Sequence, residues 1–537
     1  MRYSFIMEKH TDITEEKKNG GLGLIGSVMA IMLLGKVLGL LRSVLIAGRL
    51  GTETAESVAF NFASQIPRNF LDVVFASAIT SCFIPVFNSY LQKKSRDEAA
   101  RMAGNFISVI FVMSAGLALL AMAAAPAVAA VYTGDLSPGS RALTQQLLYI
   151  LLPTIVISAA AFSLTGVLQS LGEFRVPAAM SVSYNLIVIL YCFFFMDRFG
   201  VYGLAAAFLL GWLTQVAIQL PSLKKRGFVF RPAFNLRDEG LRRIARLMPP
   251  VMVSSWLLPI NIAVNMNAAA GLYGGSGAAS AAISYANELY SVITGVFILS
   301  VANVIFQSLS KQQAAEDADG FAKTMKGTLR ALIFILLPMT AGLMVLGRDI
   351  VSLFYERNNF TAFSTDLTAG AMICFAPGML GLGFQTILSR GFFAEKNGRV
   401  PMITSLAAIA INFILSFTLT GPLGAGGPAL ASSIAISVCA VIMFILAWKR
   451  HRGIADRAML AAGLKALASA CVMAVAVFFA RIPLAGALDG GFAAKGLAVA
   501  GLAALGAGIY MACAFLLRIE ETGIIVKMIN EKLKRKN

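Results

Sequence analysis

The chain has 537 residues, of which 58% are hydrophobic and only 13% charged, and its mean hydropathy is +0.76. This composition excludes a string of soluble domains and indicates a protein embedded in a lipid bilayer. The net charge of +18 would suggest a nucleic-acid partner in a soluble protein, but in a membrane protein basic loops explain most of it, so we expect no nucleic acid.

The apolar segments predict about 14 transmembrane helices, because a helix needs roughly 20 apolar residues to cross the hydrocarbon. They lie at about 22–47, 57–91, 102–132, 142–170, 176–196, 200–222, 247–273, 280–310, 327–355, 365–394, 400–420, 424–448, 459–480 and 491–517. The predicted fold class is therefore an all-α polytopic membrane protein. The short loops leave no room for a sizeable soluble catalytic domain.

Lysine and arginine indicate which side each loop occupies, because they accumulate in short cytoplasmic loops. With the N-terminus inside, the cytoplasmic segments carry 34 of the 45 basic residues, the outer loops carry 7 and the spans carry 4. This alternation predicts that the N-terminus and the C-terminus are both cytoplasmic. The most basic loop follows residue 222; we expect it to serve topology and hinge motion, with contact to anionic lipid heads as the alternative.

Short motifs recur about 224 residues apart. Arg175-Val176-Pro177 recurs as Arg399-Val400-Pro401, Gly203-Leu204-Ala205 has a looser counterpart at 427–429, and Val74-Phe75 recurs at 296–297. Matches at equivalent places predict two pseudo-symmetric six-helix lobes with a site between them. The predicted segments are a cytoplasmic N-tail at 1–21, an N-lobe at 22–222, a basic cytoplasmic linker at 223–246, a C-lobe at 247–448, two C-terminal helices within 449–518 and a basic C-tail at 519–537.

Basic side chains inside the predicted spans are the first candidates for function, because each costs several kcal/mol at the centre of a membrane helix. Lys36 lies near the middle of its span, and Arg42 follows six residues later. A structural ion pair is the alternative for Lys36. Arg68 follows Pro67 in the second span, where an intrahelical ion pair with Asp72 at i+4 is an equally good interpretation.

The second half offers amides and one acid instead of bases. Asn261, Asn265, Asn287 and Glu288 are candidates for an ion pair with the embedded bases or for coupling to a cation, while hydrogen bonding between helices is the structural alternative. A cavity that is basic on one side suits an anionic solute, above all a phosphate. We expect no catalytic residue, no metal and no cofactor: the six cysteines and two histidines lack ligand spacing, and no GxxxxGK[ST] motif is present.

Three segments resemble the MurJ (MviN) family of lipid II flippases, in the multidrug/oligosaccharidyl-lipid/polysaccharide exporter superfamily. Residues 35–43, G-K-V-L-G-L-L-R-S, resemble the family's S-R-V-x-G-x-x-R-D; residues 75–85 resemble F-A-E-G-A-F-S-x-A-F-I-P; and residues 285–287 resemble Y-A-[DN]. The resemblance places Lys36 and Arg42 on the family's two functional basic positions and adds Ser43 and Asn287 to the residues expected to bind substrate. The chain departs from the family at Arg68, which is shifted by about a turn, and at Glu288, where the family commonly has a base.

The resemblance implies a transporter, not an enzyme, of the bacterial plasma membrane. It would move a polyprenyl-diphosphate-linked peptidoglycan precursor outward by alternating access, with the head group in the cationic cavity between the lobes and the polyprenyl tail in lipid beside the last two spans. We expect a monomer that contacts membrane lipids and is driven by the membrane potential or a monovalent cation. The alternatives are a flippase for another polyprenyl-linked glycan, such as a teichoic or capsular unit, and a cation-coupled drug exporter; a membrane-embedded glycosyl transferase would need catalytic carboxylates that no motif supports.

Overall fold

The computed structural model describes residues 27–67, 75–76, 79–395 and 397–523. These residues contain helices and no β-strand, which confirms the predicted all-α class. Within them, ten helices are long and apolar enough to cross a membrane, or eleven if the bent pair α17 (Ala362–Phe375) and α18 (Gly378–Ala394) counts as one span. They match eleven of the predicted spans; those at 57–91, 247–273 and 280–310 do not meet this criterion, so the number 14 stays a prediction.

The chain divides into two compact units. The first takes residues from 1–46, 62–130 and 142–256, and the second takes 47–61, 131–141 and 257–537. The first unit is built from most of the helix Ser27–Leu50 and from η2 (Ile79–Phe83), α4 (Ile84–Lys93), α5 (Arg96–Ala123), α8 (Thr154–Ser170), α9 (Arg175–Phe194), α10 (Met196–Ala217), α11 (Gln219–Lys225) and α12 (Glu239–Ser255). Three further helices contribute to both units: α2 (Ala55–Gln65), α6 (Ala125–Thr133) and α7 (Pro138–Leu151).

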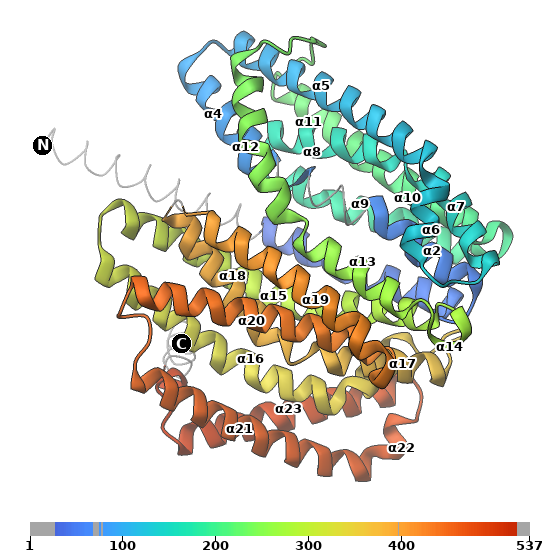
Figure 1. Cartoon of the computed structure of the whole chain (residues 1–537), viewed down its shortest axis with the longest axis vertical. Helices are drawn as coiled ribbons and strands as arrows, with labels where there is room; N and C mark the ends of the chain where they lie inside the picture. Colours follow the sequence, from blue (N-terminus) through green and yellow to red (C-terminus); the bar gives the residue numbers. More distant parts are fainter. Residues whose placement is uncertain (1–26, 68–74, 77–78, 396, 524–537) are drawn as a thin grey trace, which may run out of the picture. The chain divides into compact units, whose positions relative to one another are not determined.

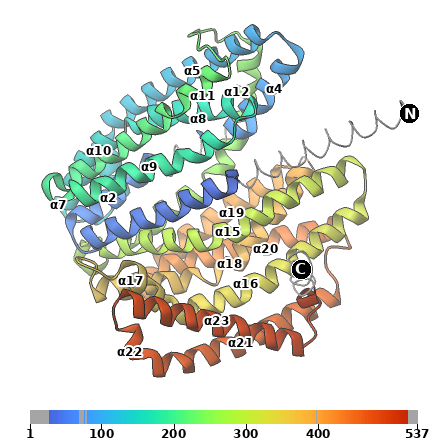
Figure 2. The ribbon, with the colours of Figure 1, turned by 180° about the vertical axis from the view of Figure 1, so that it is seen from behind.

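The second unit contains the remaining helices. They are α13 (Leu257–Ala269), α14 (Leu272–Gly275), α15 (Ala278–Ala314), α16 (Ala318–Tyr355), α17, α18, α19 (Arg399–Leu423), α20 (Gly426–Arg450), α21 (Arg457–Arg481), η3 (Ile482–Leu484), α22 (Ala485–Leu488) and α23 (Phe492–Leu516). The last two long helices, α21 and α23, lie beside α16 in both views (Figures 1 and 2). Tyr510 of α23 donates a hydrogen bond to the carbonyl oxygen of Phe334 of α16 at 2.8 Å, and Arg481 at the end of α21 holds the buried Asp349 with two hydrogen bonds.

Aromatic packing forms the core of the first unit near the start of α5. The Phe83 ring stacks on Phe106 with 4.6 Å between centroids and on Phe87 with 5.3 Å. The helix α5 itself begins with a capping box, in which Ser95 accepts from the amide of Glu98 and the Glu98 carboxylate accepts from the amide of Ser95. These contacts fix the N-terminal end of α5, on which residues 227–237 pack.

An extended segment, residues 227–237, runs along α5 between α11 and α12; we call it the strap. Asn105 of α5 donates to the carbonyl oxygen of Asn235 at 2.9 Å and accepts from the amide of Asn235 at 2.7 Å. The strap passes so close that a Cβ atom added to Gly104 would lie 2.2 Å from the carbonyl oxygen of Arg231. Glycine at position 104 is therefore required by the close approach of two backbones.

We predict that Gly104→Ala lowers the free energy of unfolding by about 1–3 kcal/mol, because the methyl group forces the strap away from α5. The matched control is Gly116→Ala in the same helix, where an added Cβ meets nothing within 4 Å; it should be neutral or slightly stabilising through helix propensity. Thermal unfolding of the two purified variants, with amide exchange of Asn235, measures the effect. Equal behaviour of the two variants would contradict the close approach.

Candidate functional site

The helix Ser27–Leu50 packs on α9 through two glycines. A Cβ at Gly35 would lie 2.1 Å from Oγ of Ser181, and a Cβ at Gly39 would lie 3.5 Å from Nδ2 of Asn185. Small residues four positions apart allow helix backbones to approach closely in a membrane. This packing fixes which face of the helix points into the first unit and therefore where the neighbouring basic residues project.

Arg42 lies on the packed face and is buried, with 6% of its surface exposed. Its Nη1 donates to Oδ1 of Asn185 in α9 at 3.0 Å, and its guanidinium lies over the rings of Tyr184 and Phe208, 5.5 and 5.7 Å from their centroids. The side-chain Nδ2 of Asn185 also donates to the carbonyl oxygen of Gly35 at 3.1 Å. Hydrogen bonding and cation–π contact together allow a charged side chain to remain inside the helix bundle.

Lys36 lies on a different face. Six residues along an α-helix correspond to a rotation of about 120° between Lys36 and Arg42, and Lys36 is exposed where Arg42 is buried. Ser43 is buried, with 2% exposed. The structure therefore does not bring the two embedded bases of this helix into one exposed group.

The second unit holds a neutral cluster of amides and hydroxyls. Asn265 of α13 donates to Oγ of Ser432 at 2.7 Å, and its Oδ1 accepts from Nδ2 of Asn412 at 3.1 Å and from Oγ of Ser416 at 3.0 Å. Asn265, Asn412 and Ser416 are each at most 2% exposed. The cluster ties α13 to α19 and α20 with hydrogen bonds between uncharged groups.

The two clusters stand at corresponding places in the sequence repeat. Arg42 and Asn265 are 223 residues apart, and Asn185 and Asn412 are 227 apart, close to the spacing of about 224 between the repeated motifs. In each unit a polar residue of the first helix thus bonds to an asparagine of the helix that begins with Arg-Val-Pro. Asn185 and Asn412 were not predicted, although an asparagine within an apolar span is itself a signal for a hydrogen bond between helices.

Three further predicted site residues lie in α13 and α15. Asn287 and Glu288 are half-buried in α15. Asn261 of α13 is buried, and its Oδ1 has no hydrogen-bond partner among the described residues. Arg68 and Asp72 lie outside the described residues. The described part of the chain has no group of three His, Cys, Asp or Glu side chains that could hold a metal ion.

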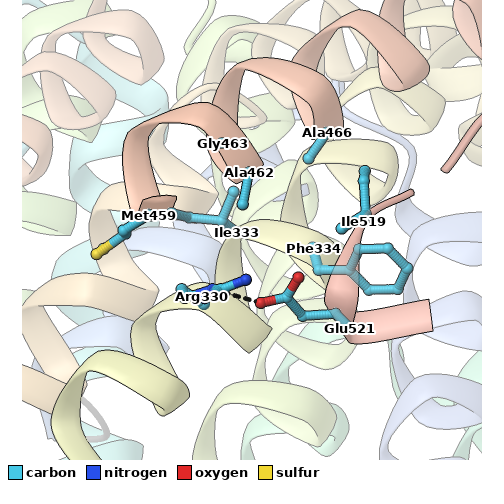
Figure 3. Close-up of a pocket in the computed structure, with 9 residues that line it drawn as sticks. All are labelled: Arg330, Ile333, Phe334, Met459, Ala462, Gly463, Ala466, Ile519 and Glu521. Carbon is cyan, nitrogen blue, oxygen red and sulfur yellow. Dashed lines mark hydrogen bonds and ion pairs between the residues drawn. The ribbon is translucent and has the colours of Figure 1, made fainter. Parts of the chain in front are cut away.

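A pocket lies where α16, α21 and the residues after α23 meet. It is lined by Arg330, Ile333, Phe334, Met459, Ala462, Gly463, Ala466, Ile519 and Glu521. Arg330 points toward Glu521 (Figure 3), donating from Nε at 2.6 Å, and its Nη2 donates to Glu520 at 2.8 Å. The paired carboxylates of Glu520 and Glu521 hold the segment after α23 on α16, and the rest of the lining is apolar.

We predict that Asn185→Leu lowers the free energy of unfolding by about 2–3 kcal/mol, because Arg42 loses a hydrogen-bond acceptor inside the bundle. The control is Ser183→Ala in the same helix, whose hydroxyl bonds only within its own turn to the carbonyl oxygen of Met180; its effect should stay under about 0.5 kcal/mol. Thermal unfolding in detergent compares them. If Asn185→Leu is no worse than the control, the burial of Arg42 does not depend on this contact.

We also predict that Glu521→Gln destabilises the protein by about 1–3 kcal/mol and Glu520→Gln by less than about 1 kcal/mol. The Glu521 side chain is 11% exposed, whereas the Glu520 side chain is 77% exposed, so solvent weakens only the second pair strongly. Melting temperatures of the two variants are the measurement. The reverse order would show that the pocket does not bury the Arg330–Glu521 pair.

Comparison with known proteins gives a consistent result across the chain. A family model described as lipid II flippase MurJ matches residues 46–498. The probable lipid II flippase MurJ of Vibrio cholerae is 28% identical over 526 residues, 95% of this chain and 98% of its own length. The lipid II flippase MurJ of Burkholderia cenocepacia is 26% identical over 436 residues, 80% and 83% of the two chains.

Solved structures show the same fold. A lipid II flippase MurJ in an inward closed conformation matches with a TM-score of 0.74 at 22% identity, covering 91% of this chain and 98% of its own. An inward-facing multidrug resistance transporter of the MATE family matches with a TM-score of 0.65 at 17% identity, covering 80% and 98%. Because the family model covers most of the sequence, the chain belongs to the MurJ family of lipid II flippases.

Proposed function

We propose that this chain is a lipid II flippase, which moves the pyrophosphate and sugar head group of a polyprenyl-linked peptidoglycan precursor from the inner to the outer leaflet of the bacterial plasma membrane. The observation that carries the proposal is the match of the family model over residues 46–498, with relatives named lipid II flippases. The polytopic helical fold is consistent with transport rather than catalysis. We propose that both termini lie in the cytoplasm, from the distribution of basic residues, and that the protein acts as a monomer.

The basic residues of the first helix take different parts in this proposal. Lys36 is exposed and supplies a mobile ammonium group for the diphosphate in a cationic cavity that the two lobes open in turn to each side of the membrane. Arg42 is held by Asn185, Tyr184 and Phe208, so it adds positive potential and positions the helix rather than reaching the head group in this conformation. Ser43 and Asn287 remain proposed contacts, Arg68 remains a proposed cavity base, and Asp72, Glu288, Asn261 and Asn265 remain candidates for ion pairing or coupling.

The membrane potential can drive the cycle without nucleotide. With the cell interior negative, moving negative charge outward is favourable by about 2.3 kcal/mol per charge for each 100 mV. If Lys36 neutralises part of the diphosphate in the loaded step, the remaining gain appears when the empty, positively charged protein returns inward. A monovalent cation is the alternative driving ion.

Two other transport functions remain alternatives: a flippase for another polyprenyl-linked glycan and a cation-coupled drug exporter. A teichoic or capsular glycan on the same polyprenyl-diphosphate carrier would use the same cavity, so lipid-linked intermediates that accumulate after depletion of the protein distinguish the substrates. The likeness to MATE transporters shows the fold alone at 17% identity, and it does not by itself favour drug export.

We predict that Lys36→Ala abolishes complementation of a flippase-deficient strain, while Lys36→Arg retains a substantial part, because the substrate needs a positive charge at this position. The control is Lys465→Ala in α21, an exposed lysine within another span, which should complement fully. Growth is scored with the membrane level of each variant verified. Full growth with Lys36→Ala would remove this lysine from the proposed mechanism.

A further inference from the structure

The strap, residues 227–237, is fixed on the side that faces α5, which we call its inner side. Phe228 packs against the aromatic core of the first unit, and the amide of Ala233 donates to Oγ of Ser108 at 3.3 Å, in addition to the pair between Asn105 and Asn235. Arg226 anchors its beginning, donating to the carbonyl oxygen of Leu171 and to Glu173, each at 2.8 Å. The strap is therefore an ordered element with a defined inner and outer side.

The outer side combines apolar and basic side chains. Four large apolar residues on it are exposed: Val229 at 61%, Phe230 at 47%, Phe234 at 60% and Leu236 at 59%. Six exposed bases lie in or beside it: Lys224, Lys225, Arg231, Arg237, Arg242 and Arg243. The two acids that follow the strap, Asp238 and Glu239, offset only part of this charge, so six bases against two acids leave it net positive.

The contacts with α5 place the strap at the membrane boundary. It touches α5 at Gly104, Asn105 and Ser108, which lie within the first two turns of the predicted span 102–132. Nine residues separate the N-cap Ser95 from Gly104, which corresponds to about 13 Å along the helix. The strap thus lies where the polar end of α5 gives way to its hydrocarbon-spanning part, at the depth of lipid head groups and the first acyl carbons.

We propose that the strap is a docking site for anionic phospholipids: Phe230, Phe234 and their apolar neighbours enter the acyl region, and the surrounding bases bind the phosphates. Segments with exposed aromatic and aliphatic side chains among lysine and arginine bind this interface by combining apolar burial with attraction to anionic head groups. The charge favours an anionic lipid as the occupant, because six exposed bases accompany the exposed apolar side chains of the strap. The strap leads into α12, after which the chain enters the longest segment of the second unit at Leu257, so bound lipid would act on one of the chain connections between the units.

The test measures amide exchange of residues 229–236 in the full-length protein, in nanodiscs of phosphatidylcholine alone and in nanodiscs with increasing phosphatidylglycerol. We expect slower exchange as phosphatidylglycerol rises. In the double variant Arg231→Gln, Arg237→Gln, half-protection should require roughly 30-fold more phosphatidylglycerol, since each base near the surface changes the affinity about fivefold. Phe230→Ser with Phe234→Ser should remove the protection in both lipid compositions.

The matched control is Lys449→Gln with Arg452→Gln, two exposed bases at another helix end, which should leave the protection of the strap unchanged. The proposal is overturned if the wild-type strap exchanges equally in both lipid compositions, or if the control shifts the titration as much as the strap variant, because the effect would then be one of total charge. It is also overturned if the strap exchanges freely in every nanodisc and is protected only in native membranes, since that result points to a protein occupant.

Discussion

A positive charge within the membrane-spanning part of a protein must either bond to the protein or reach water, because hydrocarbon offers no other partner. The first helix places two bases in different surroundings six residues apart. Arg42 is enclosed by Asn185 and two aromatic rings, whereas Lys36 is exposed on a face turned by about 120°. The glycines at 35 and 39 allow one face of the helix to pack closely on α9. This packing buries Arg42 and leaves Lys36 exposed.

The repeat preserves the position of this contact but changes its charge. In the second unit, an asparagine stands near the place of Arg42, and the cluster around it satisfies its hydrogen bonds without an ion. A neutral cluster ties helices together at a lower desolvation cost than a buried charge does. The contact that holds an arginine in the first unit is therefore made between neutral groups in the second.

The continuous apolar segments of the sequence predicted most of the long helices. Predicted spans such as 176–196 and 424–448 correspond to α9 and α20 within about two residues, because a long apolar run has few alternatives in a membrane protein. The site was less predictable. Sequence places Lys36 and Arg42 on one helix, but only the contact with α9 shows that they face different surroundings, and the partners Asn185 and Asn412 lie more than 140 residues away from the residues they bind. The strap was predicted only as a basic loop, since its fixed path depends on a glycine in a different helix.

In the proposed transport cycle, Lys36 faces water on the transport path and Arg42 does not. Modification by a membrane-impermeant thiol reagent tests it directly, with Lys36→Cys and Arg42→Cys introduced separately into a chain whose six cysteines are replaced. We expect the variant at position 36 to react with the reagent and added lipid II to slow this reaction. The variant at position 42 should remain unmodified in the folded protein. An unreactive position 36, or equal reaction at both positions, would contradict the proposed difference in water exposure between Lys36 and Arg42.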